Sequence, residues 1–272
     1  MAGLSAATAN GQLKVGLALG GGAVRGIAHL GVLMVLEREQ IPIHYVSGTS
    51  VGALVGALYS AGWNTADMLY FGNQLGWQNL ARPVWPRLGL VSFDPMRKLL
   101  NEMLGDITFS ELQRPFAVVA MDIDTGEMVT ISEGKVAPAV VASCSVPGIV
   151  EPVQLNGRWL CDGGIVDNLP TSSVRKLGAD FVIGVDVFQP RFRRRGGPLG
   201  MGLTAIEVMI NRAGMGYSYA DCLIQPRLAG LSYVLFKSRE QLIAYGVEAA
   251  ENALPALRQA LRQQSIPVAV AA

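Results

Sequence analysis

The stretch "VSGTSVGALVGALYS" (residues 46–60) decides the fold of this chain. It places Ser50 between Gly48 and Gly52, with an apolar segment on either side. A strand that leads into a Gly-x-Ser-x-Gly turn and a helix that leaves it form a nucleophile elbow, which presents the serine hydroxyl at the start of the helix. The same glycines also suit an ordinary tight junction between a strand and a helix. Other parts of the chain have to separate these two interpretations.

The composition indicates a folded protein with a substantial core. Half of the 272 residues are hydrophobic and 16% are charged, which excludes disordered and fibrous classes. The net charge of +1 gives no indication of a nucleic-acid partner. Cys144, Cys161 and Cys222 lack metal-ligand or disulfide spacing, so a reducing compartment is favoured.

Residues 40–66 contain no Asp, Glu, Lys or Arg and are long enough to suggest a membrane span. Pro42 and the glycine turn interrupt this stretch, and the part after the turn is too short to cross a bilayer. A buried strand, turn and helix explain it better. The N-terminal "MAGLSAATANGQLK" lacks the early basic residue and apolar region of a secretory signal. We therefore expect a cytoplasmic protein without a signal peptide or transmembrane helix.

A strand, a glycine turn and a helix follow one another twice near the N-terminus. The first strand is "KVGLAL" and the second is "IHYVSG". This alternation predicts parallel strands covered by helices. Further apolar strands are expected at "PFAVVAMD", "EMVTIS", "RWLCDGG" and "DFVIGVDV", and an amphipathic helix at about residues 239–262. With no repeat or linker, we expect a single domain over residues 1–272, a three-layer α/β/α fold with a mostly parallel central sheet.

A serine nucleophile needs a base, and the histidine content limits the choice. The two histidines, His29 and His44, both precede Ser50. The order of an α/β-hydrolase, with histidine after serine, is therefore impossible. Each histidine also has an ordinary place, His29 packed on the first helix and His44 at the start of the second strand.

A carboxylate can replace the histidine, and Asp162 is the candidate. It ends a strand and precedes Gly163 and Gly164, so we expect it at the carboxyl edge of the sheet, where ligand sites gather. Partial burial would make its carboxylate more basic. Alone, Asp162 is better explained as a turn or capping residue. Together with the two other glycine turns, it is favoured as the base.

The first glycine turn, "GGGAVRG" (residues 20–26), supplies a third function. Acyl transfer places negative charge on a carbonyl oxygen, which preorganised N–H groups stabilise. We expect backbone donors at Gly21, Gly22 and Ala23, with Arg25 adding positive charge. A dinucleotide loop that started at Gly20 would need glycine at position 25, and no Walker Lys-Ser or Lys-Thr follows.

The three turns in this order resemble those of the patatin-like phospholipases, particularly small bacterial members related to the catalytic domain of neuropathy target esterase. The resemblance implies a Ser–Asp dyad without histidine, with Ser50 as the nucleophile and Asp162 as the base. The family's x-Gly-Gly-Gly-x-Arg-Gly loop aligns with residues 20–26, and Ala23 replaces the third glycine. The residues that support these motifs are Gly20, Arg25, Gly26, Gly48, Gly52, Gly163 and Gly164.

Other stretches that resemble the family are "GIAHLGVL", "MDIDTGE" and "ASCSVPGIVEPV". The core motifs cover about residues 14–187, whereas residues 188–272 form a variable part in which substrate choice could lie.

The resemblance implies a serine acyl hydrolase that cleaves carboxylic esters of lipids or lysophospholipids and needs no metal or organic cofactor. A thioesterase or a short-chain carboxylesterase with the same dyad is an alternative. A non-catalytic regulatory protein and a nucleotide-binding domain are two further alternatives.

Four other aspartates and two loops have ordinary explanations beside functional ones. The aspartates at 122, 124, 167 and 186 lack ligand spacing, so capping is favoured over a metal site, with Asp167 capping the helix after "DNLP". The basic loop at residues 188–195, from Phe188 through Phe192 to Arg195, is a solvated loop or a contact with anionic lipid headgroups. The loop around Trp85 is an ordinary packed loop or a lid.

Overall fold

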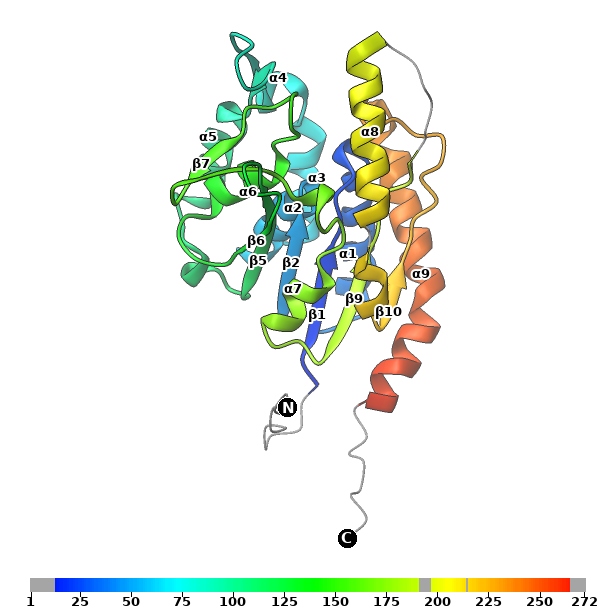
Figure 1. Cartoon of the computed structure of the whole chain (residues 1–272). Coiled ribbons are helices and arrows are strands. Elements are labelled where there is room, and N and C mark those ends of the chain that lie inside the picture. Colours follow the sequence, from blue (N-terminus) through cyan, green and yellow to red (C-terminus); the bar gives the residue numbers. More distant parts are fainter. Residues whose placement is uncertain (1–12, 191–196, 214, 265–272) are drawn as a thin grey trace.

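The computed structural model describes residues 13–190, 197–213 and 215–264. Their main feature is an eight-stranded sheet with the order β10-β9-β1-β2-β5-β8-β7, in which β6 also pairs with β5 (Figure 1). Five strands are parallel neighbours: β1 (Val15–Leu19), β2 (Tyr45–Thr49), β5 (Phe116–Asp122), β9 (Phe181–Val185) and β10 (Cys222–Ile224). The antiparallel pairs involve β6 (Met128–Ile131), β7 (Val153–Leu155) and β8 (Arg158–Asp162).

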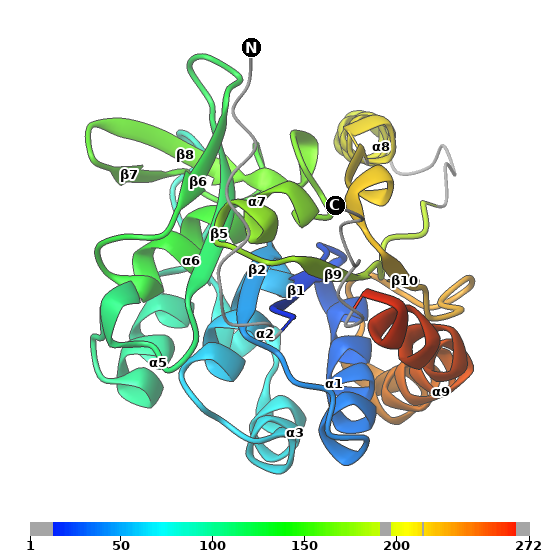
Figure 2. The same cartoon turned by 90° about the horizontal axis from the view of Figure 1, so that it is seen from below.

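Helices cover both faces of this sheet. One face carries α1 (Ala28–Arg38), α2 (Val51–Ser60), α3 (Thr65–Gln74), α5 (Asp94–Leu104), α6 (Val136–Cys144) and α9 (Arg239–Gln264), and the other carries α7 (Thr171–Lys176) and α8 (Gly197–Ala213) (Figure 2). This arrangement confirms the predicted three-layer α/β/α fold with a mostly parallel central sheet. Every residue of β1 and β9 is buried, as expected for central parallel strands covered on both faces.

The C-terminal part of the described chain joins the same architecture. β10 extends the sheet beyond β9, and α9 packs against α1. Their contact needs glycine, because a Cβ at Gly31 would lie 2.1 Å from the carbonyl oxygen of Ile243, and a Cβ at Gly246 2.1 Å from that of Ala28. In the described parts of the chain, no helix is both long and apolar enough to cross a membrane.

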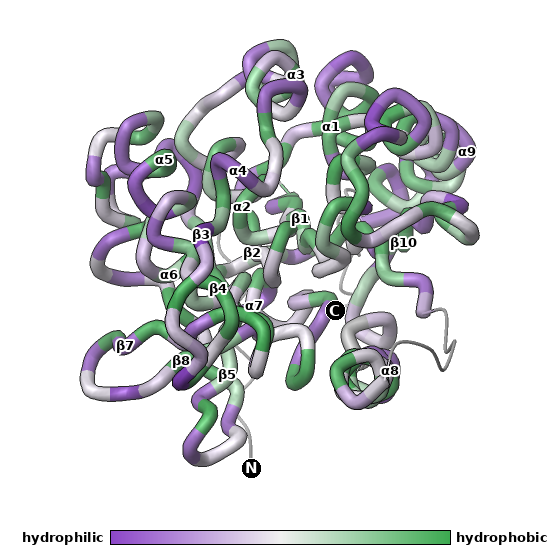
Figure 3. The backbone as a smooth tube through the Cα atoms, turned by 90° about the horizontal axis from the view of Figure 1, so that it is seen from above, coloured by the Kyte–Doolittle hydropathy of each residue, from purple (hydrophilic) through white to green (hydrophobic). Residues whose placement is uncertain are grey.

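Short elements surround the carboxyl end of the parallel strands. A hairpin of β3 (Arg82–Pro83) and β4 (Val91–Ser92) follows α4 (Trp77–Leu80), and the 3₁₀ segment η5 (Phe236–Ser238) precedes α9. Figure 3 looks onto this end, where α4, the hairpin and α8 lie around the central strands, and colours β4 as hydrophobic.

The feature of the sheet that positions the site is a junction on one edge of β5. Both β2 and β6 pair with Val118 and Val119, and both β6 and β8 pair with Ala120 and Met121. A strand has only two edges, so β2 and β8 must share the edge opposite β6. They approach from opposite directions, and their carboxyl ends meet beside Val119 and Ala120.

Candidate active site

Ser50 lies at the turn between β2 and α2 with φ 55° and ψ −126°, a left-handed conformation that is unfavourable for a residue with a side chain. Its two flanking glycines permit this turn. A Cβ at Gly48 would lie 2.4 Å from the carbonyl oxygen of Gly52, and one at Gly52 would lie 2.1 Å from that of Leu19. The Gly-x-Ser-x-Gly pattern therefore has a steric cause, because the backbone of α2 lies so close to β1 and β2 that no Cβ fits at positions 48 and 52.

The junction on β5 brings Ser50 and Asp162 together across 112 positions of sequence. The Ser50 Oγ donates a hydrogen bond of 2.6 Å to Oδ2 of Asp162. The other carboxylate oxygen, Oδ1, accepts the Gly164 N–H at 2.8 Å. Gly163 is required here as well, because a Cβ on it would lie 2.3 Å from the carbonyl oxygen of Val119.

Burial of Asp162 changes its acidity. Desolvation raises the pKa of this carboxyl from 3.8 to about 6, although the hydrogen bonds from Ser50 and Gly164 act in the opposite direction. The carboxylate is consequently the main form at neutral pH and is more basic than an exposed aspartate. It can accept the proton of the hydroxyl that contacts it.

The glycine-rich loop runs from Gly20 into the 3₁₀ segment η1 (Ala23–Ile27) beside Ser50. Its first two N–H groups are already engaged: Gly20 donates to the Val185 carbonyl at 2.9 Å and Gly21 to the Asn168 carbonyl at 3.1 Å. The backbone N–H groups of Gly22 and Ala23 have no hydrogen-bond partner among the described residues. Of the three predicted oxyanion donors, Gly21 is therefore already engaged, and the role stays a prediction for Gly22 and Ala23.

Ala23 has a φ of 50°, at the position where the family pattern has glycine. A left-handed conformation costs a residue with a Cβ about 1–2 kcal/mol. We expect Ala23→Gly to raise the free energy of unfolding by up to about 1 kcal/mol after the added freedom of the unfolded glycine is counted. Urea unfolding monitored by tryptophan fluorescence measures this change. A loss of stability on Ala23→Gly would contradict the strain at this position.

Arg25 does not have the predicted role at the oxyanion site. Its guanidinium is fully buried and donates to the carbonyl oxygens of Gln189 and Leu231, each at 2.7 Å. It also lies 3.8 Å from the ring centroid of Tyr233. The charge of Arg25 is therefore directed at the C-terminal backbone, which it ties to the glycine-rich loop. Gly26 packs against α2, where a Cβ would lie 2.3 Å from the Val51 side chain.

Both histidines form hydrogen bonds with backbone groups other than those of Ser50 and Asp162. The Nε2 of His29 lies 2.8 Å from the Gly20 carbonyl, and burial lowers the pKa of His29 to about 4. The ring is thus neutral, and its Nε2–H supports the glycine-rich loop. His44 accepts the Val15 N–H at its Nδ1, at 3.0 Å.

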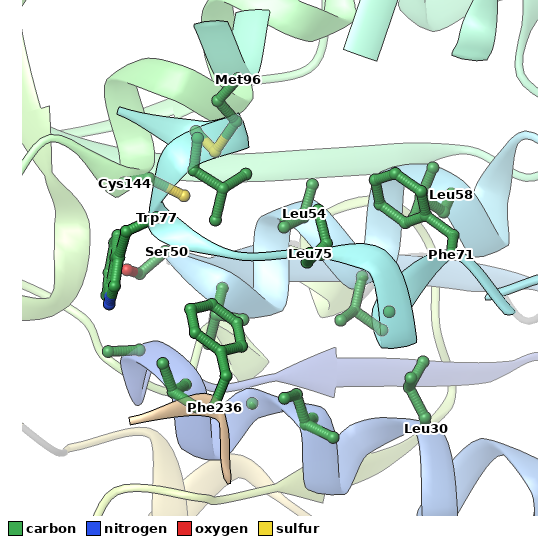
Figure 4. A pocket seen from close by; sticks show the side chains of 18 of the residues that line it. Leu30, Ser50, Leu54, Leu58, Phe71, Leu75, Trp77, Met96, Cys144 and Phe236 are labelled. Atoms are coloured by element: carbon green, nitrogen blue, oxygen red, sulfur yellow. The ribbon is translucent and has the colours of Figure 1, made fainter. Parts of the chain in front are cut away.

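An apolar cavity of about 150 Å³ begins at Ser50. It extends along α2, with Leu54 and Leu58 on one wall, and ends near Phe71 (Figure 4). Close to Ser50 its wall is formed by the residues Trp77, Met96, Cys144 and Phe236.

Two aromatic side chains of this wall were not predicted from the sequence. The rings of Trp77 and Phe236 meet edge to face at 5.6 Å, and the Trp77 Nε1–H donates to the Val234 carbonyl at 2.8 Å. They come from α4 and η5, which carry no motif, so no sequence signal distinguishes them from packing residues. Trp85, the candidate lid residue, lies on the β3–β4 hairpin with 81% of its surface exposed and does not line the cavity.

The remaining predicted residues lie away from the cavity. In the described parts of the chain, no three His, Cys, Asp or Glu side chains form a group that could hold a metal ion. Asp186 accepts hydrogen bonds from Tyr217 and Gln225. Asp167 accepts the Ser172 hydroxyl at 3.5 Å, although the residue at the cap position of α7 is Pro170.

The predicted lipid contact at residues 188–195 is partly corrected. Phe188 is buried and packs against Tyr233, with a distance of 6.0 Å between ring centroids, so it cannot reach a lipid surface. Phe192 and Arg195 lie outside the described residues.

Comparisons with known proteins agree with this fold. A sequence model of the patatin-like phospholipase family matches residues 17–175, more than half of the chain. An uncharacterised NTE family protein of Mycobacterium tuberculosis is 31% identical over 177 residues, which cover 64% of this chain and 49% of that protein. The lysophospholipase NTE1 of Meyerozyma guilliermondii is 32% identical over 206 residues, which cover 73% of this chain and 14% of that protein.

Solved structures show the same fold at low sequence identity. VipD from Legionella pneumophila has a TM-score of 0.52 and 14% identity, with coverage of 94% of this chain and 68% of that chain. Human GIVD cytosolic phospholipase A2 has a TM-score of 0.53 and 12% identity, with coverage of 96% and 61%.

The solved structures define the fold class, a three-layer α/β/α fold that this chain shares with VipD and the cytosolic phospholipase. The chain belongs to the patatin-like phospholipase family. It spans about half the length of the mycobacterial relative and a seventh of the yeast one. The family match ends at residue 175, so a single domain over residues 1–272 stays a prediction.

Proposed function

We propose that this chain is a serine acyl hydrolase that cleaves carboxylic esters of lipids through Ser50 and Asp162. The observation that carries the proposal is the 2.6 Å hydrogen bond between these two side chains at one end of an apolar cavity. Asp162 accepts the proton of Ser50 while the Ser50 Oγ attacks the acyl carbonyl. The N–H groups of Gly22 and Ala23 stabilise the oxyanion, and the amino end of α2 contributes its dipole.

The remaining steps use the same groups. Protonated Asp162 returns its proton to the leaving alcohol, which leaves an acyl ester on Ser50. A water molecule then attacks this ester, Asp162 accepts its proton, and the fatty acid departs as the proton returns to Ser50. No step requires a metal ion or an organic cofactor.

The cavity supports an acyl chain as the group that is bound. Ser50 and Leu58 are eight positions apart on α2, which corresponds to about 12 Å along the helix axis. Each methylene group that is buried contributes about 0.8 kcal/mol, equivalent to about a fourfold rise in kcat/KM. With p-nitrophenyl esters of increasing length, we expect kcat/KM to rise by this factor per methylene until the cavity is filled, and then to level off. A flat dependence would contradict lipid esters and favour the short-chain esterase.

The same acyl chain on different leaving groups separates the other candidates. We expect fatty acid release from lysophosphatidylcholine, because the NTE1 relative is named a lysophospholipase and the cavity leads away from Ser50 as a single apolar space. Faster turnover of an acyl thioester of equal chain length would assign a thioesterase. A thermal shift with ATP or NAD, and none with a fatty acid, would assign the nucleotide-binding alternative.

We also propose a peripheral contact between the carboxyl end of the sheet and a lipid surface. The β3–β4 hairpin exposes Trp85 and Leu88, and the first turns of α8 expose Leu199 and Met201. Both elements lie at the end of the molecule toward which β1 and β2 run, where Ser50 is located (Figure 1). The Ser50 end of the cavity would then lie on the side of the lipid.

Trp85→Ser tests this contact. Insertion of an exposed aromatic side chain into a lipid surface contributes about 1.5–3 kcal/mol, so we expect sedimentation with phosphatidylcholine–phosphatidylglycerol vesicles to weaken by at least about tenfold. Tyr219→Ser is the control, because Tyr219 is 54% exposed and precedes β10 at the amino end of the parallel strands. Equal effects of the two substitutions would contradict the proposed orientation.

A cytoplasmic location is part of the proposal. Cys144, Cys161 and Cys222 are all free thiols in the structure, which suits a reducing compartment. Fractionation of cells that express the chain, with thiol labelling of the recovered protein, tests this location.

A further inference from the structure

Ser143 occupies a place where the ladder between β2 and β5 would have its next hydrogen bond. The Val46 N–H donates to the Pro115 carbonyl at 3.0 Å, and successive bonds of a parallel ladder recur every two residues on each strand. The register of β2 and β5 therefore places the Ser50 N–H opposite the Val119 carbonyl. That direct bond is absent from the hydrogen bonds of the described residues.

The hydroxyl of Ser143 takes its place. The Ser50 N–H donates to the Ser143 Oγ at 2.8 Å, and the Ser143 Oγ–H donates to the Val119 carbonyl at 2.6 Å. Ser143 is fully buried near the end of α6, so no water competes for either bond. One inserted hydroxyl thus satisfies both backbone groups and separates β2 from β5 at this point.

The insertion coincides with the two features on which the proposed chemistry depends. Ser50 leaves the strand with the strained φ of 55° at this position. On β5, the residue after Val119 is Ala120, and it pairs with Asp162 of β8. The hydroxyl of Ser143 therefore lies where the strand of the nucleophile ends and the strand of the base begins.

We propose that Ser143 is a positioning residue for Ser50, an inference that rests on the proposed function. Its hydroxyl acts as a spacer that holds the Ser50 backbone away from β5, so that the Ser50 Oγ reaches Asp162. Without it, the Ser50 N–H and the Val119 carbonyl are buried and unpaired, which favours a direct bond between them. The direct bond draws Ser50 into the plane of the sheet and away from the carboxylate.

Ser143→Ala tests the spacer. A displacement of a reacting group by about 1 Å can cost about 100-fold in rate, so we expect kcat to fall by about that factor with little change in KM. The second-order rate of Ser50 labelling by a fluorophosphonate is expected to fall equally. Ser145→Ala is the matched control, since Ser145 is also fully buried beside α6, and among the described residues its hydroxyl bonds to the Val141 carbonyl alone, one turn earlier in the chain. We expect it to stay within twofold of the parent protein.

The pH profile separates positioning from a general loss of packing. The Ser50 hydrogen bond lowers the pKa of Asp162, so its loss in Ser143→Ala moves the acid limb of kcat/KM to higher pH. A crystal structure of the variant is expected to show the Ser50 N–H bonded directly to Val119. Parent-like kcat and acid limb, or an unchanged Ser50 backbone in the crystal, would overturn the proposal.

Two further comparisons complete the test. If Ser143→Ala is recovered unfolded, Ser143→Cys is the second variant, because it keeps a small side chain but has a weaker hydrogen-bonding atom. The same three readouts then decide. Parent-like values overturn the spacer, whereas a reduced kcat with a shifted acid limb supports it. Ser50→Ala separates the proposed function from the role of Ser143. If Ser50→Ala stays active, the proposed function fails, whereas an inactive Ser50→Ala with a fully active Ser143→Ala removes only the role of Ser143.

Discussion

Substitution of Ser50 by alanine is expected to abolish fluorophosphonate labelling and to lower kcat for the best ester substrate on the order of 10⁵–10⁶-fold. The reason is the loss of the atom that forms the acyl intermediate, while the cavity and the N–H donors remain. The fold is expected to persist, because alanine meets the same backbone strain at φ 55° that serine does.

The control for this prediction is Ser110→Ala, because Ser110 is an exposed residue of η2 (Phe109–Glu111) and does not line the cavity. We expect it to be labelled and to turn over substrate like the parent protein. Intact-mass measurement of the labelled proteins counts the attached probe. Equal labelling of the parent and Ser50→Ala would show that another residue is the nucleophile.

Asp162→Asn is expected to lower kcat/KM on the order of 10⁴-fold, because the amide cannot accept the proton of Ser50. The parent enzyme should lose about tenfold in kcat/KM per pH unit below the pKa of Asp162, which is about 6. In the variant, this acid limb should disappear. A parent-like limb in Asp162→Asn would assign the titration to a different group.

The same substitution is expected to increase stability at alkaline pH. The pKa of Asp162 is about 6 in the folded protein, whereas the ordinary pKa of an aspartate is 3.8, so folding favours the protonated form. The stability this carboxyl contributes is fully present below about pH 3.8 and is lost as the pH rises through about 6. Two pKa units correspond to about 3 kcal/mol.

Asp162→Asn removes this pH-dependent penalty. Urea unfolding at pH 8 should show the variant to be more stable by up to about 3 kcal/mol, with a difference that shrinks as the pH is lowered toward 4. A constant difference across this range would show that Asp162 is not the desolvated group. The base would thus be held at a cost to folding that its chemistry requires.

The sequence was sufficient to predict the fold and to select Ser50 and Asp162, because two kinds of information can be read from the sequence directly. Glycines at 48, 52 and 163 are fixed by backbone contacts that no side chain tolerates, so they mark the turns in the sequence. The count and order of the histidines exclude the commoner base. The roles of both residues stay predictions until the variants are measured.

The geometry that joins the pair could not be predicted from the sequence. We expected Asp162 at the carboxyl edge as the end of one more strand of a mostly parallel sheet, whereas β8 is antiparallel to β5 and meets β2 end to end. Strand direction depends on long-range pairing, which the residues of β8 do not encode. For the same reason, nothing in "ASCSVPG" distinguishes the hydroxyl of Ser143 from the small side chains beside it.

The donors and the cavity wall also depend on distant contacts. The engagement of Gly21 by Asn168 and of Arg25 by Gln189 and Leu231 joins segments more than 140 positions apart. Trp77 and Phe236 meet only because η5 packs on α4. None of these pairings has a periodicity or a spacing in the sequence.

The junction on β5 has a consequence for how such a chain can diverge. Since β2 and β8 are both registered on one strand, the spacing of the hydroxyl and the carboxylate is set by the rungs of β5 rather than by the polypeptide between them. The hairpin of β3 and β4 and the turn between β5 and β6 can therefore lengthen, shorten or be exchanged without altering the reacting pair. Changes in substrate preference can accumulate in these connections while the reacting pair is inherited unchanged.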